Sequence, residues 1–164
     1  MLISRELAEA INAQIGHEFG AGMQYVSIAG YFQRNNLTLL AQLFSAQADE
    51  ERVHAMKFVK YMLDTGGDLR IPAIPAPKAT FASAEEAVQA ALTWEQGVTG
   101  QITGLMDIAV KQHDYLAQSF LQWFIDEQLE EVVKMGRLLS VIKQSGDRNL
   151  LMVEAYLVHL EKAG

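Results

Sequence analysis

The feature that most limits the fold is a long connection between two pairs of helical segments. Residues 66–83, GGDLRIPAIPAPKATFAS, contain all three prolines of the chain, which disfavours a helix or a central strand there. A stretch of this length without secondary structure is unusual inside a compact domain and normally has a structural reason. At about 3.3 Å per residue it is long enough to run beside a helix of roughly 26 residues, which is about 39 Å long. The helices that it joins can therefore lie parallel to each other.

Four long segments show the apolar spacing of amphipathic helices. We expect these helices at about residues 4–33, 39–64, 83–109 and 114–143, followed by a short amphipathic helix at about 148–160. Ser83 and Glu86 form a capping-box pattern at the start of the third helix, and Gly66 with Gly67 ends the second. The turns RNNLT and KQHD are short, so the first pair and the last pair each form an antiparallel hairpin.

These connections predict an all-α fold. It is a four-helix bundle with one long crossover loop between helices two and three and a short fifth C-terminal helix, in one domain over residues 1–164. The net charge of −7 argues against a nucleic-acid-binding surface. The absence of cysteine excludes disulfides and thiolate metal sites. We see no signal-peptide pattern and no apolar run long enough for a membrane span, so we expect a cytoplasmic protein.

Each apolar stripe carries a glutamate near the middle of its helix. These residues are Glu18, Glu51, Glu95 and Glu131, and Gln128 lies one turn before the last of them. Antiparallel neighbours of similar length have their middles at one level, so the four carboxylates should form one layer. His54 is three residues after Glu51, so the two side chains share a helix face and can bind one ion together.

This layer needs a source of positive charge. A single glutamate on an apolar stripe is usually a boundary residue, but four at one level carry a desolvation penalty and repel one another. No lysine or arginine shares the stripes at that level, so we expect a pair of metal ions to compensate. Carboxylates with one imidazole suit iron or manganese better than a closed zinc site, and bridging carboxylates hold two ions close together.

Four motifs now carry a family resemblance: HEFGAGMQY, DEERVH, WEQ and LQWFIDEQLEE. With the crossover and the short last helix, they make the chain similar to the non-haem bacterial ferritins over essentially its whole length. The resemblance implies an iron-storage ferroxidase that oxidises Fe(II) with dioxygen or hydrogen peroxide at an intrasubunit diiron centre. It also implies storage of the ferric product as a mineral inside a cage of twenty-four subunits.

The resemblance assigns roles to individual residues. Glu18, Glu51 and His54 resemble one iron site, and Glu51 bridges to a second site completed by Glu95, with Glu131 and Gln128 nearby. A candidate third iron site consists of Glu50, Glu127 and Glu130, with Glu131 as a candidate shared ligand. Tyr25 matches the family's tyrosine near the site, as a hydrogen-bonding group or electron donor; the alternative is an ordinary core tyrosine.

Departures from related families matter as well. Haem-binding ferritins carry a second Glu-x-x-His motif, but the matching tetrad here ends in Glu130; they also place methionine where this chain has Arg52. We therefore predict no haem. The positions that match the acidic pore of animal ferritins are Gln118 and Leu121, which leaves the route by which iron enters open.

His17 is expected to be a packing or interface residue. The alternative function is a diiron oxidoreductase of low oligomeric state that does not store iron.

Overall fold

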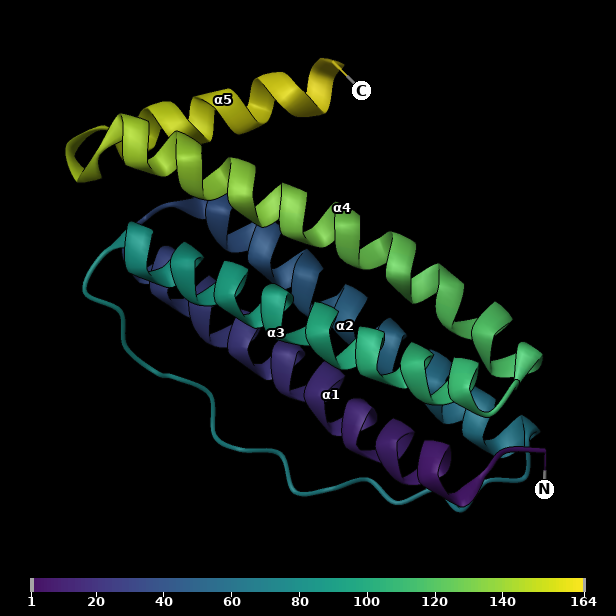
Figure 1. The fold of residues 1–164 in the computed structure, drawn as a ribbon. Helices are drawn as coiled ribbons and strands as arrows, with labels where there is room; N and C mark the ends of the chain where they lie inside the picture. Colours follow the sequence, from purple (N-terminus) through teal and green to yellow (C-terminus); the bar gives the residue numbers. More distant parts are fainter. Residues whose placement is uncertain (1, 164) are drawn as a thin grey trace.

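The computed structural model describes residues 2–163 and confirms the predicted four-helix bundle with a short last helix (Figure 1). The elements are α1 (Arg5–Arg34), α2 (Thr38–Asp64), α3 (Ala84–Lys111), α4 (Tyr115–Ser145), the 3-10 turn η1 (Asp147–Asn149) and α5 (Leu150–Ala163). Each helix begins and ends within one turn of the position expected from the sequence. No helix among residues 2–163 combines the length and the apolar character needed to cross a membrane.

The helices form two antiparallel hairpins, α1 with α2 and α3 with α4 (Figure 1). The crossover between Asp64 and Ala84 runs outside the bundle along its length, so α2 and α3 point in the same direction. The two hairpins meet chiefly through α1 and α3. Helix α5 leaves the end of α4 at an angle and packs against α4 and α2.

Local signals explain where the helices begin and end. The side chains of Ser4, Ser83 and Asp114 each accept a hydrogen bond from the backbone N–H three residues later, as N-caps do. After α2, Gly66 adopts φ 73°, and the Gly67 N–H donates to the Met62 carbonyl oxygen at 2.8 Å. This Schellman arrangement satisfies free carbonyls at the end of the helix and turns the chain into the crossover.

Helix α1 holds the crossover through two buried side-chain amides. Asn12 donates to the Asp68 carbonyl oxygen and accepts from the Arg70 N–H, both at 2.9 Å. Gln24 pairs in the same way with both backbone groups of Lys78, at 3.2 and 2.9 Å. Each amide therefore satisfies one backbone donor and one backbone acceptor of a segment that has no secondary structure of its own.

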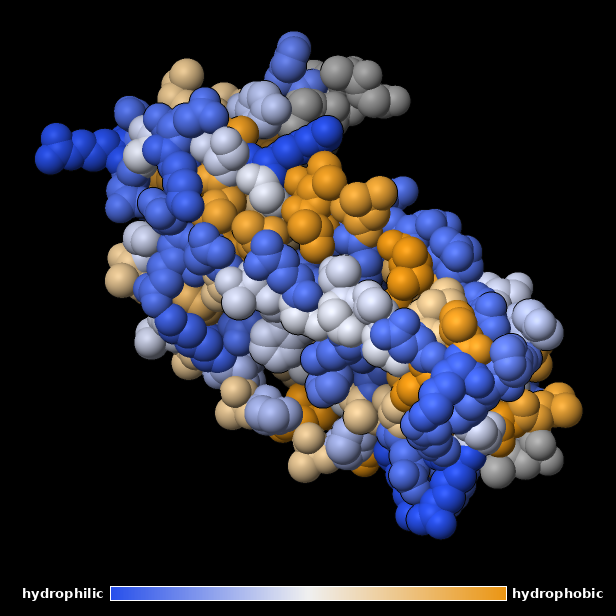
Figure 2. Space-filling view, viewed as in Figure 1, coloured by the Kyte–Doolittle hydropathy of each residue, from blue (hydrophilic) through white to orange (hydrophobic). Residues whose placement is uncertain are grey.

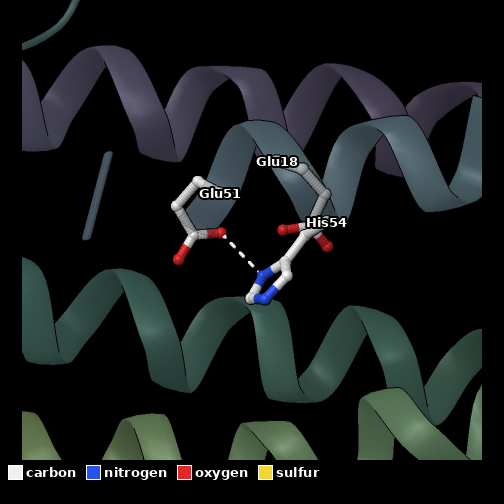
Figure 3. A group of neighbouring side chains, drawn as sticks. All are labelled: Glu18, Glu51 and His54. Atoms are coloured by element: carbon white, nitrogen blue, oxygen red, sulfur yellow. Dashed lines mark hydrogen bonds and ion pairs between the residues drawn. The ribbon is translucent and has the colours of Figure 1, made fainter. Parts of the chain in front are cut away.

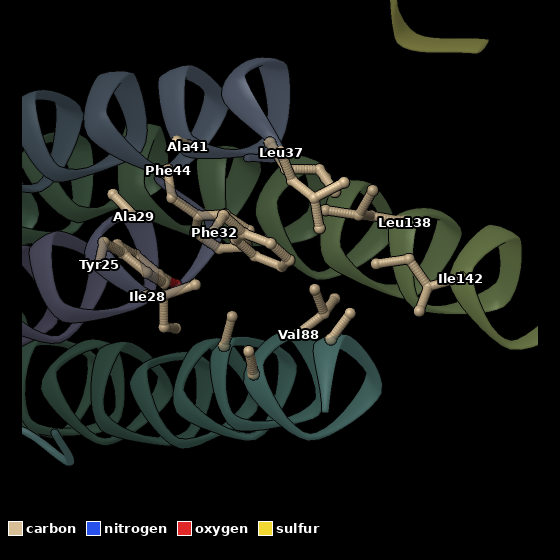
Figure 4. Close-up of a cluster of buried hydrophobic side chains, with 14 of the residues drawn as sticks. Tyr25, Ile28, Ala29, Phe32, Leu37, Ala41, Phe44, Val88, Leu138 and Ile142 are labelled. Carbon is tan, nitrogen blue, oxygen red and sulfur yellow. The ribbon is translucent and has the colours of Figure 1, made fainter. Parts of the chain in front are cut away.

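The apolar core is divided into two clusters along the bundle. One lies toward the α5 end; Figure 4 shows Tyr25, Phe32 and Phe44 there, packed against Val88 and Leu138. The other lies toward the opposite end and consists mainly of Leu7, Ile11, Ile15, Phe58, Met62, Val98, Ile102, Leu105, Leu121 and Phe124. Between these clusters lies a layer of buried polar residues, which apolar packing closes on both sides: Glu18, Gln47, Glu51, His54, Glu95, Gln128 and Glu131.

Apolar side chains also reach the surface beside α5 (Figure 2). A groove of about 410 Å³ between α4 and α5 is lined by Leu43, Val133, Leu138, Val141, Tyr156 and Leu157, together with charged residues at its edge. Met23 and Val26 on α1 are 51% and 58% exposed. This single chain therefore leaves apolar surface uncovered on α1 as well as beside α5.

Candidate metal centre

The layer between the two apolar clusters is fully buried. Glu18, Glu51, His54, Glu95 and Glu131 are each between 1% and 4% exposed. They come from all four long helices, because each helix places one of its stripe positions at the same level. Ionised carboxylates in such surroundings require hydrogen-bond donors or cations close by.

Three of these residues converge on one point (Figure 3). Ligand atoms of Glu18, Glu51 and His54 all lie within 4.8 Å of one another, which is close enough to hold a single ion. The His54 Nδ1 atom is 3.2 Å from Glu51 Oε2, since the i, i+3 spacing puts both side chains on one face of α2. The carboxylate of Glu18 approaches them from α1.

The Glu95 carboxylate is held from two sides. The buried Tyr25 hydroxyl donates a hydrogen bond to Glu95 Oε1. The Gln128 amide nitrogen donates to Glu95 Oε2 at 3.2 Å and also to the Glu95 backbone oxygen at 3.1 Å. Tyr25 is thus more than a packing residue, because its hydroxyl touches one of the four central carboxylates.

The Glu131 carboxylate has two partners that were not among the predicted site residues, Gln47 and Lys134. Gln47 donates to Glu131 Oε2 at 2.7 Å and to Glu51 Oε1 at 3.3 Å, so one amide links two carboxylates. The Lys134 ammonium lies 3.8 Å from Glu131 Oε1 and 2.5 Å from Gln47 Oε1. No lysine or arginine was found on the stripes at this level, but a basic side chain from beside the stripe reaches the layer. Lys134 lies off the apolar stripe, but its long side chain extends back to the layer.

The predicted third iron site is not brought together. Among the described residues, Glu18, Glu51 and His54 alone form a group of three close enough to share one ion; neither the set Glu50, Glu127 and Glu130 nor the set Glu51, Glu95 and Glu131 does so. Glu127 Oε1 instead lies 3.7 Å from His54 Nε2, on the side of the ring opposite Glu51. Glu130 lines the groove between α4 and α5. A carboxylate behind a histidine orients the ring and raises its basicity, which suits Glu127 to that supporting position.

The chain is similar in sequence to known proteins over most of its length. Residues 8–145 match the model of the ferritin-like domain. The chain is 38% identical over 146 residues to the bacterial non-heme ferritin of Staphylococcus saprophyticus, covering 89% of this chain and 87% of the relative. It is 40% identical over 147 residues to ferritin BfrB of Mycolicibacterium smegmatis, covering 90% and 81%.

The chain belongs to the ferritin family. Its resemblance to the non-haem bacterial ferritins is thereby confirmed. Solved structures agree: an open pore ferritin from Archaeoglobus fulgidus superposes with a TM-score of 0.91 at 30% identity, over 95% of this chain and 96% of that one. A humanized archaeal ferritin gives the same TM-score and identity over 94% and 95%.

The buried carboxyls of this ferritin hold their protons strongly. Burial raises the pKa of Glu18 well above its usual range, and the negative charge of Glu51 raises it further. Burial and the charge of Glu51 raise the pKa of Glu95 to about 7. Burial also raises the pKa of Glu131 to about 7, although the Lys134 ammonium opposes that rise. A cation that binds here must therefore displace protons from carboxyls that are partly protonated at neutral pH.

The histidine and the tyrosine of the layer are shifted as well. Burial lowers the pKa of His54, but its hydrogen bond to Glu51 and the charges of Glu51 and Glu127 outweigh burial and raise the pKa overall. Burial and the charge of Glu95 raise the pKa of Tyr25 well above its usual range. Tyr25 therefore remains a hydroxyl donor at neutral pH.

The donor set fits a hard cation such as iron. Glu18 Oε1 accepts a hydrogen bond from Gln14 at 2.8 Å, but Glu18 Oε2 is buried and has no hydrogen-bond partner. A buried carboxylate oxygen without a partner is costly unless it faces a cation. This oxygen lies on the carboxylate that faces Glu51 and His54, where an ion would have only oxygen and nitrogen ligands.

Two buried glutamines, Gln14 and Gln47, belong to the layer but were not predicted as members of it from the sequence. Gln14 precedes Glu18 by four residues and Gln47 precedes Glu51 by four, so each amide reaches its carboxylate along the same helix face. This repeated Gln-x-x-x-Glu spacing is visible in the sequence and is the signal that identifies them. His17, expected to pack or form an interface, is exposed on this chain, with its Nδ1 3.5 Å from Gln14 Oε1.

Proposed function

We propose that this ferritin stores iron, and that it oxidises Fe(II) to Fe(III) at a diiron ferroxidase centre inside each bundle. The observation that carries the proposal is the layer of four buried carboxylates and His54, closed on both sides by apolar clusters, with Glu18 Oε2 lacking a partner. Family membership and relatives named bacterial non-heme ferritin support the same conclusion.

In this proposal each iron ion is a substrate with its own ligands. Glu18, Glu51 and His54 hold the first Fe(II), supported by the close approach of their ligand atoms. Glu51 bridges to the second Fe(II), which Glu95 and Glu131 complete. Gln128 and Tyr25 orient Glu95 through the hydrogen bonds described above.

Residues of the layer also release protons when Fe(II) binds. Fe(II) binding displaces protons from Glu95 and Glu131, whose pKa values of about 7 make that release easy near neutral pH. Two Fe(II) ions then each lose one electron. Either dioxygen takes up both electrons with two protons and forms hydrogen peroxide, or hydrogen peroxide takes up both electrons with two protons and forms two molecules of water. The ferric product leaves the layer for a mineral.

Storage as a mineral requires an enclosed volume, so we propose assembly into a homo-oligomeric cage of twenty-four subunits. The uncovered apolar residues of α1 and the groove beside α5 are available for contacts between copies. Native mass tests this part directly. A mass near one or two subunits would exclude the cage and favour the alternative, an oxidoreductase that does not store iron. Location in the cytoplasm and the absence of haem stay predictions.

The function is tested by adding Fe(II) anaerobically and then dioxygen, with Fe(III) formation followed by stopped-flow absorbance. Wild type is compared with the double variant Glu51→Ala, His54→Ala. The matched control, Glu9→Ala with His113→Asn, removes one carboxylate and one imidazole from exposed positions. We expect rapid oxidation in wild type and control and its loss in the double variant. If the double variant oxidised Fe(II) as fast as wild type does, the site of oxidation would not be the one formed by Glu51 and His54.

A further inference from the structure

Lys134 lies one turn after Glu131 on α4, and its ammonium points toward α2. The Nζ atom donates to Gln47 Oε1 at 2.5 Å and lies 3.4 Å from Glu50 Oε2 and 3.8 Å from Glu131 Oε1. An ammonium has three donors and no acceptor, so these three oxygens match its capacity. The side chain is 41% exposed, so the ammonium could also lie in water. Its position beside the layer is therefore due to attraction by these three oxygens.

The position of this ammonium is close to the proposed diiron centre. Gln47, which accepts from Lys134, donates to both Glu51 and Glu131. The charge of Lys134 also lowers the pKa of Glu131, against the effect of burial. The Lys134 ammonium is thus linked to Glu51 through the Gln47 amide, and it lies 3.8 Å from the Glu131 carboxylate with no residue between them.

Glu50 belongs to the third iron site that the sequence predicted, and Glu131 was a candidate ligand shared between that site and the second iron. The remaining two candidates are placed elsewhere, Glu127 behind His54 and Glu130 at the groove beside α5. The cation between Glu50 and Glu131 in this chain is therefore an ammonium supplied by the protein. A second cation at the same two carboxylates would be repelled by it.

We propose that Lys134 is a built-in cation that takes the place of a third iron ion and limits tight binding to two Fe(II) ions per chain. The inference rests on the proposed diiron function and adds a determinant of how many ions the centre holds. Because the ammonium is tethered within reach of Glu50 and Glu131, it competes with hydrated Fe(II) at a high effective concentration.

The test counts tightly bound Fe(II) per assembled chain by anaerobic equilibrium titration, without any oxidant. Lys134→Gln removes the charge. Lys143→Gln is the control, because it makes the same charge change on α4, where Lys143 pairs with the exposed Glu85 at 3.7 Å. We expect two ions in wild type, two in Lys143→Gln and three in Lys134→Gln. Adding Glu50→Gln to Lys134→Gln should return the number to two.

Two results overturn the inference: a third ion already present in wild type, or only two ions in Lys134→Gln. Native mass and circular dichroism check that each variant assembles, and Lys134→Met is measured in parallel as a second neutral replacement. If wild type bound no iron inside the bundle, the proposed diiron function would fail instead, so the two failures are distinguishable.

Discussion

Replacing Glu95 by glutamine should stabilise the metal-free protein at alkaline pH. The carboxylate is 1% exposed, and its pKa is raised from the ordinary 4.5 to about 7 by burial and by Glu51. A raised carboxyl pKa means that the folded state binds the proton more tightly than the unfolded chain does. The resulting destabilisation is absent below about pH 4.5, grows between about 4.5 and about 7, and is complete above that.

The size of the effect follows from these pKa values. At about 1.4 kcal/mol per pKa unit, ionising Glu95 costs about 3 kcal/mol of folding free energy at about pH 8. Glutamine removes this cost, but its single oxygen cannot accept from both Tyr25 and Gln128, which costs about 1 kcal/mol. The net gain is about 2 kcal/mol, or roughly 4–8 °C in the unfolding midpoint for a chain of this size.

Differential scanning calorimetry of metal-stripped protein measures this midpoint at about pH 8 and about pH 5. Glu95→Gln should unfold at a higher temperature than wild type at the alkaline pH and show no gain at the acid pH. Glu85→Gln, an exposed change on the same helix, is the control and should have little effect. A loss of stability of equal size at both pH values would refute the reasoning, since it would show that the charge of Glu95 carries no cost.

Four further outcomes are expected. Tyr25→Phe removes a donor that lowers the pKa of Glu95, so anaerobic Fe(II) titrations should show several-fold weaker binding near pH 6.5 and a smaller loss near pH 8. Gly16→Ala brings a methyl group against Pro72 of the crossover and should lower the free energy of unfolding by about 1–3 kcal/mol in denaturant titrations. Gly97→Ala, which meets no neighbour, should instead raise it by up to about 1 kcal/mol. The absorption spectrum of the purified protein should lack a haem band; a haem band bound in proportion to the chain would contradict that prediction.

The bundle and its polar layer were predictable because helical periodicity is local. Glu18 and Glu51 fall on apolar stripes that can be read directly from the sequence, and similar helix lengths place them at one level. The crossover was predictable from its prolines, but its course was not. That course depends on Asn12 and Gln24, whose side chains pair with the crossover backbone at positions far away in the sequence.

Residues next to the stripes were harder to place. The periodicity of α4 indicates which face Glu127 occupies, but its partner, His54, lies on α2, and the separation of the two helices decides whether they meet. Lys134 escaped notice because stripe positions are defined by backbone direction, whereas its flexible stem carries the charge back to Glu131 and across to Gln47. The contacts of long charged side chains at the edge of a stripe can therefore be determined only from the three-dimensional structure.

The most direct test of the account is to locate iron in crystals soaked anaerobically with Fe(II), using anomalous diffraction at the iron edge. We expect two peaks inside each bundle, one within bonding distance of Glu18, Glu51 and His54 and one between Glu51, Glu95 and Glu131. Iron bound only at surface carboxylates, with no peak in the buried layer, would contradict the central claim.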